Sequence, residues 1–193
     1  MNHRYLIEIK KLQDLFKPLG FEVAVGGGLA YDAYIGKFSR PHGDLDIDII
    51  GKVDHKTGFT TVSKSVFKTY PNISTVKNNR LIVEDGKFVI DIEYVQIIDE
   101  SKNIYQYADG CYTYPVVTYL HNRGKIGKYI FTIENPNSLF VIKLLQPILG
   151  KKSIRLKDVH DLKLIRPYLD FDQLIKSCEF ELNYFKERLN KTK

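Results

Sequence analysis

Three aspartates alternate along one short segment of the chain. Asp44, Asp46 and Asp48 are separated by Leu45 and Ile47, so in an extended strand the carboxylates project from one face and the apolar side chains from the other. Carboxylates at this spacing repel one another unless cations neutralise them. A divalent metal ion would remove that repulsion, and a solvent-facing edge strand is the alternative explanation of the same pattern.

A second acidic segment follows later in the chain. Asp91 and Glu93 alternate with isoleucines and therefore share one face of a predicted strand. A strand placed beside the first one brings another carboxylate to the site of Asp44 and Asp46. Converging carboxylates suit Mg²⁺, which prefers oxygen ligands and shares its coordination shell with substrate phosphates.

Three consecutive glycines precede the first acidic segment. Gly26, Gly27 and Gly28 lie between a strand predicted over residues 21–25 and a helix predicted over residues 29–35. Glycines let the backbone approach phosphates closely, and a helix N-terminus points its N–H groups at them. Tight turns use the same residues, so the triplet indicates a phosphate site only in combination with the carboxylates.

The segment from the glycines to the aspartates resembles the nucleotidyltransferase superfamily that includes DNA polymerase beta, and within it the aminoglycoside and lincosamide antibiotic nucleotidyltransferases. The matching features are a glycine pair, a helix that carries Asp32, a Gly-Lys pair, a basic residue before His42, and an Asp-x-Asp sequence. The resemblance covers residues 22–50, with weaker support from residues 88–94 and 155–161.

The resemblance implies an enzyme that transfers a nucleoside monophosphate from an NTP to a hydroxyl and releases pyrophosphate. Asp44, Asp46 and Asp91 would hold Mg²⁺, as two ions, and Asp91 would be the general base, with Glu93 as the alternative. The resemblance and the positive charges together suggest six nucleotide-binding residues: Gly27, Gly28, Lys37, Arg40, Lys143 and Lys157. Solvated loop charges and surface salt bridges are the alternative explanation of the four basic ones.

The spacing of apolar residues predicts the elements that must position these side chains. A first helix is expected over residues 5–16 and another over residues 57–70. Strands over residues 80–84 and 87–97 form a predicted hairpin, because Asp85-Gly86 between them favours a tight turn.

The C-terminal third of the chain has a different pattern. Short strands are predicted between residues 105 and 133, where glycines and prolines obscure their bounds. Three helices are predicted after them, over residues 139–149, 155–169 and 171–189. The fold class is therefore α/β (α+β), with a mixed, twisted sheet of about five strands, flanking helices and a small helical C-terminal part. We expect a catalytic domain over residues 1–135 and a helical subdomain over residues 136–193.

Composition places the chain among ordinary globular proteins. Its 193 residues are 44% hydrophobic and 27% charged, and no apolar stretch approaches the roughly 20 residues that span a bilayer. Glu8 and Lys10 interrupt the N-terminal segment where a signal peptide is apolar, so a cytoplasmic protein without membrane partners is expected. Cys111 and Cys178 lack the spacing of a zinc or redox motif and are expected to be buried thiols.

Charge bears on the acceptor, which the motif leaves open. The formal net charge of +6 favours anionic ligands, although lysines and arginines are scattered along the chain. The glycine-to-aspartate match favours a small-molecule antibiotic and hence antibiotic resistance. Aminoglycosides are polycations that prefer an acidic cleft, so a neutral, lincosamide-like acceptor fits the basic chain better.

Two alternatives to a small-molecule acceptor remain. The first is a nucleic-acid acceptor such as tRNA, as in toxin-like relatives of the superfamily, for which the 13 tyrosines and 11 phenylalanines offer stacking surfaces. The second is a non-catalytic nucleotide-binding module. The presence of Asp44, Asp46 and Asp91 together argues against the second alternative, and the sequence leaves the oligomeric state open.

Overall fold

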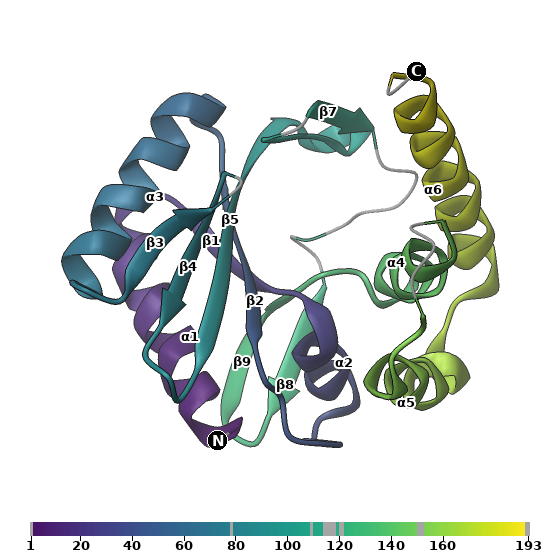
Figure 1. The fold of residues 1–193 in the computed structure, drawn as a ribbon, viewed down its shortest axis with the longest axis horizontal. Helices are drawn as coiled ribbons and strands as arrows, with labels where there is room; N and C mark the ends of the chain where they lie inside the picture. Colours follow the sequence, from purple (N-terminus) through teal and green to yellow (C-terminus); the bar gives the residue numbers. More distant parts are fainter. Residues whose placement is uncertain are drawn as a thin grey trace.

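A mixed sheet forms the centre of the molecule (Figure 1). The structure is a computed structural model, and it describes residues 2–77, 79–108, 110–113, 119, 122–149 and 153–191. The strands are β1 (Glu22–Val25), β2 (Leu45–Gly51), β3 (Ser74–Lys77), β4 (Arg80–Glu84), β5 (Val89–Asp99), β6 (Ile104–Tyr107), β7 (Gly110–Thr113), β8 (Arg123–Ile126) and β9 (Tyr129–Ile133). Their order is β3-β4-β5-β2-β1-β9-β8, and β6 and β7 extend the sheet from β5.

Six α-helices surround this sheet. They are α1 (Asn2–Phe16), α2 (Gly27–Ile35), α3 (His55–Thr69), α4 (Pro136–Leu149), α5 (Leu156–Ile165) and α6 (Phe171–Lys191). Three single-turn 3-10 helices occupy Lys17–Leu19, Glu100–Lys102 and Arg166–Tyr168. These counts refer to the described residues.

The predicted fold class is confirmed, since the sheet is mixed and helices flank it. The predicted number of about five strands is wrong, because the described part of the chain contains nine. Four of them, β6 to β9, are only four or five residues long and follow the long strand β5. Residues 114–118, 120 and 121, which belong to the segment predicted to hold short strands, lie outside the described residues.

Strands β2 and β5 run side by side in parallel and provide the face that carries the site. Their alternating isoleucines point to the other face, where Ile47 and Ile92 are at most 1% exposed. Helices α1 and α3 cover that face, and their apolar residues share one core with it (Figure 1). Burial of each large apolar side chain is worth about 1.5–3 kcal/mol, so the register of β2 and β5 is fixed with the carboxylates facing away from this core.

The C-terminal helices pack together on the other side of the sheet. Helix α4 contacts both α5 and α6, and α2 contacts α4 and α5. The side chain of Asn135 accepts a hydrogen bond of 2.9 Å from the backbone N–H of Asn137, which satisfies one unpaired donor in the first turn of α4. This group of helices therefore stands opposite the carboxylate face of β2 and β5.

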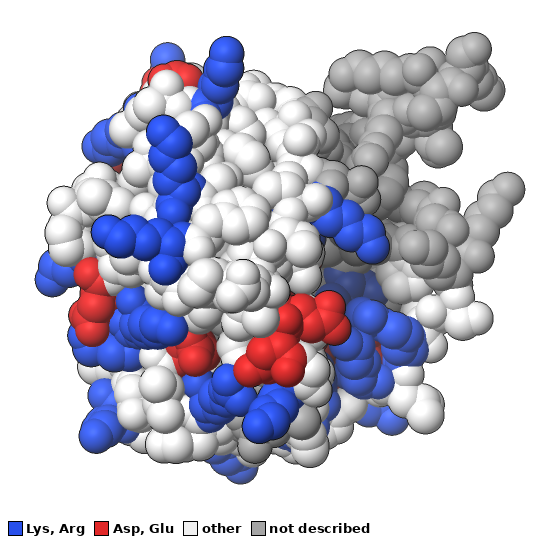
Figure 2. Space-filling view, turned by 60° about the vertical axis from the view of Figure 1, so that its left-hand side comes forward, with Lys and Arg blue, Asp and Glu red and all other residues white. Residues whose placement is uncertain are grey.

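The face of the molecule shown in Figure 2 is basic. Figure 2 brings forward the side on which α1 and α3 lie in Figure 1, and lysines and arginines dominate its charged surface. Cys111 is exposed and Cys178 is half-buried, so the expectation of buried thiols is wrong for Cys111. No helix in the described part of the chain has the length and apolar character needed to cross a membrane.

Candidate active site

Register places the predicted carboxylates in two adjacent pairs. Asp46 on β2 is level with Asp91 on β5, and Asp48 is level with Glu93. Neighbouring strands lie about 4.8 Å apart, so each pair is close enough for strong repulsion between its charges. The prediction that the two acidic strands run side by side is confirmed. Asp44 lies just before β2 and is about half exposed.

Arg80 joins the two carboxylates of β5, and the sequence analysis did not single it out. Its Nη1 donates to Asp91 Oδ2 at 3.0 Å, and its Nη2 donates to Glu93 Oε2 at 2.6 Å. Arg80 begins β4, the antiparallel neighbour of β5, and the next residue, Leu81, is fully buried. Alternation in this predicted hairpin therefore indicated that Arg80 faces the same side as Asp91.

The carboxylates of the site carry more negative charge than the neighbouring basic side chains neutralise. Burial, with repulsion from Asp44 and Asp91, raises the pKa of the Asp46 carboxyl. Burial also raises the pKa of Asp91, although Arg80 opposes that shift. One buried oxygen of Asp91, Oδ1, has no hydrogen-bond partner among the described residues, a cost of about 1–3 kcal/mol for such a group.

These oxygens are the donor set that a hard divalent cation prefers. Among the described residues, however, no three acidic, histidine or cysteine side chains are already gathered as an assembled metal site. Asp44 instead pairs with Lys157, whose Nζ lies 3.7 Å from Asp44 Oδ2. The chemistry of the site thus suits Mg²⁺, while the grouping of Asp44, Asp46 and Asp91 around it stays a prediction.

The glycine turn lies directly against the acidic strand. Gly26 N–H donates to the backbone oxygen of Asp46 at 2.9 Å. Gly27 begins α2 with φ of +61°, and a Cβ atom there would lie 2.0 Å from Asp46 Oδ2. A Cβ on Gly28 would lie 2.4 Å from the guanidinium of Arg40. Only glycine therefore fits where the N-terminus of α2 meets the carboxylates.

Gly27→Ala is expected to reduce both stability and nucleotidyl transfer. The left-handed φ alone costs roughly 1–2 kcal/mol for alanine, and the new methyl group also displaces the Asp46 carboxylate. Gly20→Ala is the matched control, because Gly20 has φ of +79° and a methyl group added there would meet no atom within 4 Å. Chemical denaturation and transfer assays should show a loss of activity in Gly27→Ala only. Equal effects in the two variants would mean that strain, and not contact with Asp46, explains the glycine.

The predicted basic residues fall into two groups. Lys143 lines the cavity beside the carboxylates, and Lys157 reaches Asp44. Arg40 makes a two-pronged ion pair with Asp161, with both N–O distances at 2.8 Å, behind Gly28. Lys37 is exposed at the C-terminal end of α2, away from the glycines, so the structure does not bring it to the site. The nucleotide-binding roles of these residues stay predictions.

The loop before β2 is held by a buried polar cluster. Asp32 on α2 accepts a hydrogen bond from Ser39 Oγ at 2.5 Å, and its other oxygen lies 2.7 Å from His42 Nε2. Asp32 and His42 are both at most 2% exposed. Through these contacts, His42 and Asp32 hold the loop that leads to Asp44.

Asp158 and Asp161 on α5 are buried. Lys143 Nζ lies 3.3 Å from Asp158 and 3.1 Å from Asp161. Burial opposes ionisation of Asp161, but the hydrogen bond from Arg40 and the charge of Lys143 outweigh it and lower the pKa. These ion pairs tie α5 to α4 and to the loop after α2.

Asp161→Asn is expected to destabilise the fold by about 3–5 kcal/mol, because it leaves the Arg40 charge without its buried partner. The exposed Asp14, paired with Lys10, is the control, and Asp14→Asn should cost at most about 1 kcal/mol. Because the folded pKa of Asp161 is lowered, its contribution is complete above its ordinary value near 3.8 and is lost as pH falls through the folded value. Urea unfolding at neutral and acid pH measures both effects; a cost no larger than that of Asp14→Asn would contradict this role.

A cavity of about 380 Å³ opens between the carboxylate face and the C-terminal helices. Five acidic and three basic side chains line it: Asp46, Asp48, Glu93, Glu134, Glu181, Arg80, Lys143 and Arg155. Its other lining residues are Gly26, Gly27, Tyr107, Tyr112, Tyr119, Leu139, Ile142 and Phe180. The lining thus contains more acidic than basic side chains, together with aromatic rings, while the face shown in Figure 2 is basic.

Glu134 and Glu181 are cavity residues that the sequence analysis missed. Glu134 directly follows β9, and Glu181 lies on α6. The available signal was weak: Ser177 and Glu181, four residues apart, put polar side chains on the buried face of a predicted helix. Burial raises the pKa of Glu181 to about 7, and burial with repulsion from Asp48 raises the pKa of Glu134 well above its ordinary value.

Known structures share this fold. The solution structure of the antibiotic-resistance factor ANT(2'')-Ia has a TM-score of 0.76 at 16% identity, over 100% of this chain and 99% of that chain. The lincomycin-bound lincosamide antibiotic adenylyltransferase LnuA has a TM-score of 0.61 at 18% identity, over 84% and 96%. An antigenic nucleotidyltransferase-like protein from Paracoccidioides brasiliensis has a TM-score of 0.53 at 17% identity, over 97% and 89%.

Sequence comparison gives a more specific assignment. A search of curated proteins finds no match. Residues 8–130, well over half of the chain, match the family described as aminoglycoside-2''-adenylyltransferase. The match includes the glycine turn and both acidic strands. This chain is therefore a nucleotidyltransferase that belongs to the aminoglycoside-2''-adenylyltransferase family.

Proposed function

We propose that the protein transfers the nucleoside monophosphate of an NTP, with ATP as the preferred donor, to a hydroxyl of an aminoglycoside antibiotic and so confers resistance. The observation that carries this proposal is the pairing of Asp46 with Asp91 on adjacent strands, directly against the glycine turn. Family membership supports adenylyl transfer, and the acidic cavity supports a polycationic acceptor.

The reaction forms one bond and breaks another. The acceptor oxygen bonds to the α-phosphorus while the bond from that phosphorus to the bridging oxygen breaks, and pyrophosphate leaves with the electron pair. Asp91 takes the proton of the attacking hydroxyl, because its Oδ1 is without a hydrogen-bond partner in the described structure. Asp44, Asp46 and Asp91 would hold Mg²⁺, as two ions, which would neutralise charge on the phosphates.

Backbone and basic side chains position the donor. The backbone N–H groups of Gly27 and Gly28, at the N-terminus of α2, would bind the phosphates. Lys143 lines the cavity from α4, and Lys157 on α5 lies 3.7 Å from Asp44, so both would reach the phosphates. We propose that residues 136–193 form the helical subdomain that closes the phosphate-binding region over the catalytic domain of residues 1–135, in a cytoplasmic protein.

The acidic cavity changes the expectation about the acceptor. The net charge of +6 favours a neutral acceptor or nucleic acid, but the acceptor meets the cavity and not the outer surface. A cavity with five carboxylates repels a phosphate backbone and attracts a polyamine. The structure thus supports an aminoglycoside over the neutral acceptor and the tRNA that the sequence left open.

Labelled nucleotides test this proposal. Each of the four NTPs, labelled at the α-phosphate, is incubated with Mg²⁺ and with tobramycin, lincomycin or total tRNA, before and after addition of EDTA. We expect label on tobramycin from ATP, and none after chelation. Label on lincomycin or tRNA instead would overturn the acceptor class, and NTP binding without pyrophosphate release across the panel would favour a non-catalytic module.

A further inference from the structure

The outer face of helix α6 carries an apolar stripe. Its residues follow one another at the alternating intervals of four and three that place side chains on one face of a helix: Phe171, Ile175, Cys178 and Leu182. Phe171 is 71% exposed, Leu182 is 49% exposed and Ile175 is 44% exposed, while Cys178 is half-buried. The amino-acid sequence continues the same spacing at Phe185 and Leu189. A contiguous apolar surface of this kind is typical of a contact with another protein.

The inner face of α6 carries polar side chains. Gln173 Oε1 accepts a hydrogen bond from Asn135 Nδ2 at 3.2 Å, and the hydroxyl of Ser177 lies 3.5 Å from that of Ser138. Ser177 and Glu181 are at most 6% exposed. A surface helix usually turns its apolar side chains inward and its polar side chains outward. Part of α6 has the reverse arrangement, which indicates a second contact on its outer side.

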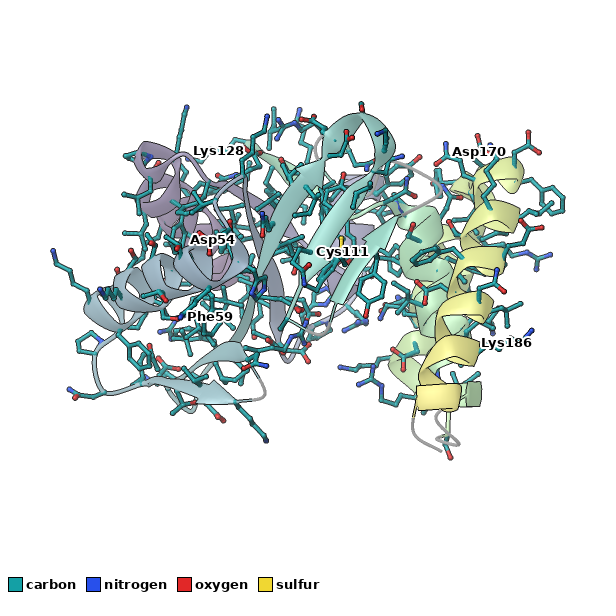
Figure 3. The ribbon with its side chains drawn as sticks, turned by 90° about the horizontal axis from the view of Figure 1, so that it is seen from above. Asp54, Phe59, Cys111, Lys128, Asp170 and Lys186 are labelled. Atoms are coloured by element: carbon teal, nitrogen blue, oxygen red, sulfur yellow. The ribbon has the colours of Figure 1, made fainter. Side chains whose placement is uncertain are left out.

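The position of α6 leaves its outer side accessible. Figure 3 shows the helix, marked by Asp170 and Lys186, at the edge of the molecule, with the other C-terminal helices between it and the strands. Figure 1 shows α6 at the same edge from another direction. Helix α4 packs against the inner side of α6. Another protein chain can therefore reach the stripe.

The polar edge beside the stripe has opposite charges in its two halves. Asp172 and Glu179 lie along this edge in the N-terminal half of α6, and Lys186 lies along it in the C-terminal half. All three residues are exposed. Fourteen residues, roughly 21 Å of helix, separate Asp172 from Lys186, so the two cannot pair within one chain. The edge is instead complementary to a copy of itself that runs in the opposite direction.

We propose that two copies of this chain pair through α6, with the two helices antiparallel and their apolar stripes in contact. A two-fold axis near the middle of the helix places Asp172 of each copy beside Lys186 of the other. This contact uses the same surface on both copies, so it closes as a dimer and does not extend into a filament. A parallel pair would place like charges beside each other along the whole edge and is disfavoured.

The mass of the protein in solution tests the pairing. Size-exclusion chromatography with light scattering, over a dilution series, should show a wild-type dimer that dissociates as it is diluted. Leu182→Glu introduces a charge into the contact twice, once from each copy, and should raise the dissociation constant of the dimer by at least about 10²-fold. Asn183→Glu adds the same charge at an exposed position of α6 outside the stripe and should leave the dimer intact.

Reversal of charges tests the direction of the two helices. Asp172→Lys and Lys186→Asp each replace two attractive pairs by two repulsive ones, and each should raise the dissociation constant about tenfold. The double variant exchanges the two charges and should restore wild-type affinity. Glu179 of the two copies lies near the axis, so Glu179→Gln removes a repulsion and should tighten the dimer. All these positions are exposed, and thermal unfolding checks that each variant folds.

Two results would overturn the pairing through α6. The first is a wild-type protein that stays monomeric up to its solubility limit, which would assign the stripe to a different partner. The second is a dimer that Leu182→Glu leaves intact. A dimer that is sensitive to Leu182→Glu but is not restored in the double charge variant would refute the antiparallel arrangement. Because the readout is mass and not activity, failure of the proposed transfer reaction would leave the pairing of α6 unaffected.

Discussion

Replacement of Asp46 by asparagine is expected to lower kcat for nucleotidyl transfer by at least about 10³-fold, since loss of several kcal/mol of charge stabilisation corresponds to that factor. Asp46 has a central place in the site: it is level with Asp91, and its side chain lies against Gly27. Asparagine keeps the shape and removes the charge. Steady-state transfer assays at saturating ATP and acceptor measure the effect.

Folding must be separated from catalysis in this variant. Removal of a repelling carboxylate from a buried site should leave the free energy of unfolding equal or higher, because Asp44 and Asp91 raise the pKa of Asp46. Asp14→Asn, at an exposed position on α1, is the activity control. A folded Asp46→Asn variant with more than about a tenth of wild-type kcat would exclude Asp46 from the reaction.

Replacement of Asp91 by asparagine is expected to reduce kcat by about 10²–10⁴-fold, the usual contribution of a general base. Glu93→Gln should reduce it less. The difference follows from Arg80: Glu93 Oε2 accepts two of its N–H groups, at 2.6 and 3.1 Å, whereas Asp91 keeps one buried oxygen without a partner in the described structure. Glu93 therefore positions Arg80, and Asp91 is available to the hydroxyl.

Comparison of the two variants identifies the base, a question that the sequence left open. Single-turnover measurements with prebound ATP isolate the chemical step from product release. A larger loss in Glu93→Gln than in Asp91→Asn would transfer the role of base to Glu93. Equal and small losses in both would show that neither carboxylate takes the proton.

Local patterns were enough to predict the centre of the site. Alternation in β2 and β5 placed the acidic side chains of each strand on one face, and the glycine triplet indicated a turn before α2. Both features depend only on residues that are neighbours in the sequence. Arg80 was predictable in principle from alternation in the hairpin. The four strands β6 to β9 were harder to predict, because strands of only four or five residues carry little periodic signal.

Long-range partners could not be predicted. The ion pair of Arg40 with Asp161 joins residues 121 positions apart, and no local pattern indicates such a pairing. Glu134 and Glu181 come from the end of β9 and from α6, and the packing of α4 and α6 against each other brings α6 to the cavity. The net charge of the chain was misleading about the acceptor for the same reason, since it does not show which charged side chains face the cavity.

The most direct test is the mass of tobramycin after incubation with ATP, Mg²⁺ and the protein. We predict a gain of one adenylyl group, an equal amount of pyrophosphate, and neither product with Asp46→Asn. Unmodified tobramycin in the presence of protein that binds Mg²⁺-ATP would contradict transfer to this class of acceptor, and an adduct formed equally by Asp46→Asn would contradict the assigned site.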